Sequence, residues 1–133
     1  MLHDNPAIQD IIDIAFDTPL TIDEDILNEI VVNLHSRDEV LALACGDTDE
    51  AFHFMRYFEN LVIDFGDNLK DLLPAAATIA AIANYVNGDE GRAQMFSYVA
   101  TNADQYYRLN NLFVRLADIG TPSEMLRTLV LSA

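Results

Sequence analysis

Helix start and stop signals recur at short intervals along this chain, and they constrain its fold more than any other feature. The tetrapeptides TIDE (21–24), SRDE (36–39) and TPSE (121–124) each place Ser or Thr three residues before Glu. In such a capping box the hydroxyl accepts from the amide three residues on, and the Glu side chain reaches back. Gly88 and Gly120 follow apolar stretches, where glycine commonly ends a helix. The chain is therefore predicted to consist of short helices with marked ends.

Apolar residues repeat at helical spacing between these signals, and the sequence has no alternating pattern long enough for a strand. We predict an all-α single domain over residues 1–133, a compact bundle of seven or eight short helices in antiparallel hairpins. The first expected helix follows Pro6 and has an apolar face of Ile8, Ile11, Ile12 and Ala15. The others start at Thr21, at Ser36 (to Gly46), at DTDE (47–50, to near Gly66), at Pro74 (to Gly88), at Asp89, at a cap on Asp104 (to Gly120) and at Thr121.

One helix pair has a pattern of small residues. Ala81, Gly88, Ala93 and Ala100 are spaced by seven, five and seven residues, which resembles the small positions of one tetratricopeptide hairpin. A second unit would need a small residue 34 positions after Ala81, where the chain has Arg115. The pattern therefore predicts one close-packed hairpin and no solenoid.

Acidic residues are concentrated in the first part of the chain. The net charge is −15, and residues 1–50 hold 13 acidic residues against one basic residue, Arg37. Residues 51–133 are near neutral, with nine acidic and six basic residues. Such a charge repels nucleic-acid backbones and anionic membranes, so we expect a protein partner with a basic surface, no direct nucleic acid and no membrane.

The sequence favours a cytoplasmic location. A lone thiol, Cys45, cannot build a disulfide framework. The N-terminal residues MLHDNPAIQD lack the basic region of a signal peptide, and the longest apolar-rich run, Pro74 to Val86, is too short to span a bilayer.

No pattern of catalytic or metal-binding residues stands out. GDEGR (88–92) lacks the residues of a phosphate loop or a calcium loop and is expected to be a helix turn. Glu50 and His53 have the spacing of half a di-iron site, but no second such pair exists in the sequence. Cys45 is expected to be a structural thiol, because a helix C-terminus and Asp47 both disfavour the thiolate. We therefore expect no catalytic residue, no metal, no cofactor and no enzyme activity.

The aromatic and arginine residues of DQYYRLNNLFVRL (104–116) are expected to divide between core and surface. The core positions are predicted to be Tyr107, Leu112 and Phe113, and the exposed ones Tyr106, Arg108 and Arg115.

Several motifs carry a family resemblance. Arg37 and Asp38 open a helix, and NGDEGRA, NADQYYRL and GTPSEM follow later in the chain. Over residues 24–130 the chain resembles the C-terminal half of an uncharacterised actinobacterial family, domain of unknown function four-one-nine-two, which also has relatives in phages. It differs in lacking the family's strand-like N-terminal half and in having Gln105 where the family often has Pro. The resemblance implies a helical fold, a stand-alone truncated form and an actinobacterial or phage source, without assigning catalytic residues.

These observations favour a non-enzymatic protein–protein interaction module, in the phage setting an accessory protein that binds a host or phage protein. Its expected contact residues are Asp23, Glu24, Asp25 and Glu29, which would face a basic partner. One alternative is an acidic nucleic-acid mimic that inhibits a DNA-binding protein. Another is a structural helical homo-oligomer with an apolar interface edge at residues 125–133. The acidity could also serve solubility alone.

Overall fold

The computed structural model describes residues 34–131, except for the side chains of residues 34–36 and 67. All regular elements in this range are helical, as predicted, and no strand occurs there. Helices predicted before residue 34 lie outside the described residues. The elements are α3 (Leu34–Ala44), α4 (Asp49–Leu69), the 3-10 helix η1 (Lys70–Leu72), α5 (Leu73–Val86), α6 (Glu90–Ala103), α7 (Arg108–Asp118) and α8 (Ser123–Leu131).

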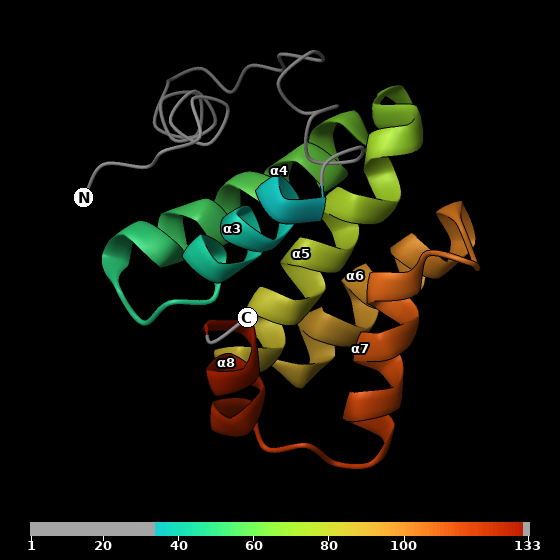
Figure 1. Ribbon diagram of the computed structural model, residues 1–133. Helices are drawn as coiled ribbons and strands as arrows, with labels where there is room; N and C mark the ends of the chain where they lie inside the picture. The colour runs from blue at the N-terminus through green and yellow to red at the C-terminus, as the bar shows by residue number, and fades with distance from the viewer. Residues whose placement is uncertain (1–33, 132–133) are drawn as a thin grey trace.

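Helix α5 is the centre of this helical bundle (Figure 1). Every side chain from Pro74 to Val86 is buried, and α5 contacts each of the other five α-helices in residues 34–131. Its alanines allow this, because small side chains let neighbouring helices approach on all sides. In Figure 1 α3 and α4 lie on one side of α5, α6 and α7 lie on the other, and α8 lies below α3 near the lower end of α5.

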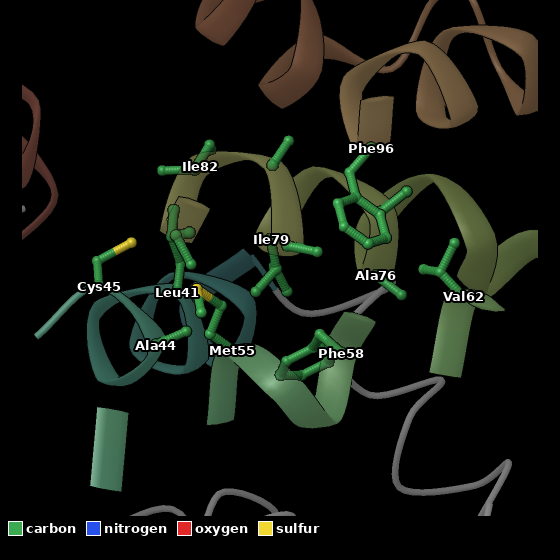
Figure 2. Close-up of a cluster of buried hydrophobic side chains, with 14 of the residues drawn as sticks. Leu41, Ala44, Cys45, Met55, Phe58, Val62, Ala76, Ile79, Ile82 and Phe96 are labelled. Carbon is green, nitrogen blue, oxygen red and sulfur yellow. The ribbon is translucent and has the colours of Figure 1, made fainter. Parts of the chain in front are cut away.

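The largest apolar side chains of the core fill the space between α3, α4 and α5. Figure 2 shows Leu41 of α3, Met55 and Phe58 of α4, and Ile79 of α5 converging there, while Phe96 of α6 lies on the other side of α5. Each is at most 6% exposed. Burial of such side chains contributes about 1.5–3 kcal/mol apiece, so this cluster stabilises the packing of α3, α4 and α5.

The turn between α5 and α6 forms as the glycine and acidic residues predict. Gly88 has a φ of 86°, and its amide donates to the Tyr85 carbonyl at 3.0 Å. The Asp89 amide donates to the Asn84 carbonyl at 2.9 Å, which completes a Schellman turn. The Asp89 side chain then caps α6 by accepting from the Arg92 amide. GDEGR is therefore a helix turn.

Two predicted boundaries in the first described helices are wrong. Ser36 is inside α3, which includes Leu34, so SRDE does not mark the start of that helix. Helix α4 starts within DTDE as expected, with Thr48 as its cap, but it continues past Gly66 to Leu69. The reason is packing: Leu69 is buried, and its burial outweighs the roughly 1 kcal/mol that one glycine costs inside a helix. The helix ends at Lys70, whose φ is 53°.

Two predicted caps near the C-terminus are also wrong. The Asp104 carboxylate accepts from the Tyr106 amide in a local turn, and α7 starts only at Arg108. Helix α8 starts at Ser123, so Thr121 is one position too early to cap it. The Ser123 hydroxyl instead donates to the Tyr85 carbonyl at 2.8 Å. Asp104 thus makes a local turn and Ser123 a hydrogen bond to another helix. Short polar side chains such as these form bonds of this kind as readily as they cap helices.

Candidate functional site

An apolar groove of about 480 Å³ lies between α3, α7 and α8, with α5 beneath it. Nine apolar residues line it, together with Arg37 and Asp38 of α3. We call it the leucine groove; its apolar residues are Leu41, Ile82, Leu109, Leu112, Phe113, Leu116, Leu126, Leu129 and Val130. Figure 1 shows the three wall helices arranged around the central α5.

The leucine groove has a buried floor and exposed edges. Leu41, Ile82, Phe113 and Leu126 are buried in the core. At the edges, Leu112 of α7 is 54% exposed and Leu129 of α8 is 51% exposed. Leu112 was predicted to be core, and this is wrong, because its side of α7 meets no further described helix. Exposed leucines that continue a buried apolar cluster are typical of interaction surfaces.

Basic residues border the leucine groove on the α7 side. Arg108 and Arg115 are exposed, as predicted, and neither forms an ion pair within residues 34–131. They stand four residues before and three residues after Leu112, so all three share one face of α7. This edge therefore offers unpaired positive charge next to an exposed leucine.

The α3 wall carries a charged cluster. The Arg37 guanidinium donates to the Asp38 carboxylate at 3.0 Å and lies near the hydroxyl of Tyr107. Burial raises the pKa of the Tyr107 hydroxyl, and the neighbouring Arg37 charge partly opposes this rise. The hydroxyl therefore stays protonated at neutral pH, and the Arg37–Asp38 ion pair leaves this end of the groove without net charge.

Hydrogen bonds hold the α8 wall in place. The Arg127 guanidinium donates to the Cys45 carbonyl at 3.0 Å and to the Asn87 side chain at 3.2 Å. The buried Tyr85 hydroxyl donates to the Thr121 carbonyl at 2.6 Å, just before α8. These bonds tie α8 to the α3–α4 loop and to the end of α5, so the groove is preformed.

A second cavity, of about 490 Å³, lies between α6, α7 and the loop before α8. Two of its polar side chains are bonded to the buried Asn110: the Ser97 hydroxyl donates to Asn110 at 2.8 Å, and Asn110 donates to Thr101 at 2.9 Å. The carboxylates of Glu90 and Asp118 also line it. No residue that lines this cavity has a buried polar atom without a hydrogen-bond partner. The cavity therefore does not indicate a particular ligand.

A buried carboxylate links three helices behind the groove. Glu59 of α4 is 1% exposed and accepts from Arg56 at 2.9 Å, from Asn84 at 2.7 Å and from Arg92 at 3.0 Å. This cluster was not predicted from the sequence, although Arg56 and Glu59 have the i, i+3 spacing of a helix ion pair. The three donors come from α4, α5 and α6, so the cluster joins these helices.

The other sequence candidates have structural roles or lie outside the structure. Burial raises the pKa of the Cys45 thiol to about 12, opposed by Arg127, so Cys45 is the inert buried thiol that was expected. Glu50 and His53 are both exposed, and no group of three potential metal ligands occurs within residues 34–131. Asp23, Glu24, Asp25 and Glu29 lie outside the described residues.

Comparison of the chain with protein-family models, curated proteins and solved structures finds no match. The resemblance to the actinobacterial family therefore stays a prediction. None of the helices between residues 34 and 131 is long and apolar enough to cross a membrane.

Proposed function

We propose that this protein is a non-enzymatic interaction module that binds an acidic amphipathic helix of a partner protein in the leucine groove. The observation that carries the proposal is one surface with an apolar floor, half-exposed leucines and a basic edge. Helix-in-groove recognition uses such a surface, because an amphipathic helix places apolar residues at i, i+3, i+4 and i+7 against the floor. Helix α7, with 11 residues, is about 16 Å long and offers room for about three turns.

The charge of the groove edge decides which helices fit. The chain as a whole has a charge of −15, yet Arg108 and Arg115 are exposed beside Leu112 without ion-pair partners among the described residues. Acidic residues on a partner helix would lie close to these arginines. Complementary charge chiefly speeds encounter and excludes wrong partners, here helices with basic flanks.

The α5–α6 pair supports the groove from behind. Ala81, Ala93 and Ala100 are each at most 1% exposed at this interface, in keeping with the predicted resemblance to one tetratricopeptide hairpin. In the proposal, this hairpin belongs to a bundle of seven or eight helices and acts as the scaffold. The groove helices α7 and α8 present the binding surface on it.

The acidic first part of the chain is a second candidate surface in the same module. Residues 1–33 contain eight acidic residues and neither Lys nor Arg, so Asp23, Glu24, Asp25 and Glu29 remain proposed contacts for a basic partner. An actinophage accessory protein acting in the cytoplasm is the setting that the family resemblance supports.

Two alternatives have their own tests. A helical homo-oligomer is favoured by the exposed Met125, Leu129 and Leu131, and light scattering over a concentration series distinguishes it from a monomer. A nucleic-acid mimic would compete with DNA for a repressor or nuclease, which a competition assay detects.

Selection from a displayed library of helical peptides tests the proposal. The library fixes an apolar stripe at i, i+3 and i+7 and randomises the flanking positions. We expect Asp and Glu to be enriched at the flanks, and binding to be lost in Leu112→Asp. Ile63→Asp is the matched control, because Ile63 is also exposed, at 60%, but lies on α4, away from the groove. Enrichment of Lys and Arg, or equal binding by both variants, would contradict the proposal.

A further inference from the structure

The leucine groove is bordered by the helix with which the described chain begins. Arg37, Asp38 and Leu41 of α3 form one wall, and α3 includes Leu34. The 33 residues before Leu34 therefore join the described bundle within one turn of a groove-lining residue.

Those residues include a segment with the chemistry that the groove accepts. In residues 6–17, PAIQDIIDIAFD, a helical arrangement puts Ile8, Ile11, Ile12 and Ala15 on one face. Its three charged residues, Asp10, Asp13 and Asp17, fall on the other face. A helix is only about 10 Å across, so these carboxylates would lie within about one Debye length of the arginines on the groove edge.

The dimensions also agree. A helix of 12 residues is about 18 Å long, and α7 is about 16 Å long. Residues 18–33 connect this segment to α3 and span about 24 Å as a helix or about 53 Å when extended. Pro19, just after the segment, disfavours a helix running straight on from it. The segment can thus reach the neighbouring groove.

We propose that residues 6–17 occupy the leucine groove of their own chain and that a partner helix must displace them. This inference rests on the proposed function, since it makes the segment a competitor for the same surface. A groove that is open for only a fraction of the time binds its partner more weakly by that fraction. Weakening the segment therefore strengthens partner binding.

Crosslinking in the full-length chain tests the occupancy. Gln9→Cys, at the edge of the segment's apolar face, is combined with Met125→Cys on α8 in a Cys45→Ala background. The control pair joins Gln9→Cys with Ile63→Cys on α4. With a short bismaleimide at low protein concentration, we expect an intramolecular crosslink at least fivefold faster in the first pair. Equal rates overturn the inference, and so does a covalent dimer, which would assign the groove to a second copy.

A second measurement separates this inference from the proposed function. The Ile11→Asp/Ile12→Asp variant should lose the crosslink and bind the selected acidic peptide at least fivefold more tightly than the unchanged chain. Unchanged peptide affinity overturns the cis occupancy and leaves the proposed function standing. No peptide binding in this variant overturns the proposed function, even where the crosslink forms in the parent chain.

Discussion

Replacing Glu59 by Gln should be among the most destabilising conservative changes in the described residues. The carboxylate is 1% exposed and accepts from three side chains on three helices, at 2.7–3.0 Å. A glutamine of the same shape removes the charge and turns one acceptor into a donor. Whichever way the amide is oriented, its NH₂ group then faces either Arg56 or the Asn84 and Arg92 donors.

The size of the loss follows from which partners can reach water. Removing one member of a buried ion pair costs about 3–5 kcal/mol when the other stays buried. Here Arg56 is 47% exposed and Arg92 38% exposed, so both can be partly solvated after the change. We therefore expect about 2–4 kcal/mol for Glu59→Gln. Arg56→Gln and Arg92→Gln should each cost about 1 kcal/mol or less, because the carboxylate keeps its other donors.

Urea unfolding followed by far-UV circular dichroism measures these differences. The double variant Arg56→Gln/Arg92→Gln should cost more than the sum of its single changes, since it leaves the buried carboxylate with Asn84 alone. A loss below about 0.5 kcal/mol for Glu59→Gln, or strict additivity of the two arginine changes, would refute the view that this cluster joins the helices.

Four further substitutions test local features by the same unfolding assay, and for Cys45 a thiol-reactivity measurement is added. Thr48→Ala should cost about 1 kcal/mol, because the Thr48 hydroxyl accepts from the Ala51 amide at the start of α4. Gly88→Ala should cost about 1–2 kcal/mol, because Gly88 has a φ of 86°. Gly66 lies inside α4 with open space around it, so Gly66→Ala should stabilise the protein by about 0.5–1 kcal/mol. A stabilising Gly88→Ala or a destabilising Gly66→Ala would contradict these assignments. Cys45 should react with a thiol reagent at pH 8 only after unfolding, because burial raises the pKa of its thiol from 9.0 to about 12. The unfolded thiol loses its proton above pH 9 and the folded one only near pH 12. The free energy of unfolding should therefore fall across that window by up to about 1.4 kcal/mol per pH unit. Cys45→Ala should remove this fall.

Local sequence signals predicted helices well where one residue determines the backbone. Gly88 and Gly120 both adopt positive φ after a helix, and Asp89 and Glu90 lie at the start of α6. Such signals act through a few neighbouring atoms of the same segment, so they can be predicted from the sequence. The prediction failed at Gly66, where burial of Leu69 decided the length of the helix, and at Asp104, whose carboxylate made a local turn instead.

The candidate site was mostly beyond sequence analysis, for a physical reason. The leucine groove combines residues from α3, α5, α7 and α8, and their proximity depends on the packing of the whole bundle. Periodicity placed Leu112 on an apolar face of α7 but could not say whether another helix covers it. The exposed arginines of the edge, Arg108 and Arg115, were predicted correctly, because an arginine side chain is rarely buried without a partner. What sequence could not supply was their position beside an open groove.

The affinity of a helical acidic peptide for the leucine groove tests the central claim most directly. The peptide selected from the library is titrated against the Ile11→Asp/Ile12→Asp chain alone and with either Leu112→Asp or Ile63→Asp added. Burial of one leucine side chain is worth about 1.5–3 kcal/mol, so Leu112→Asp should weaken binding at least about tenfold, and Ile63→Asp should leave it unchanged. Equal affinities for the two variants, or a preference for a peptide with lysine flanks, would contradict the claim that this groove binds an acidic helix.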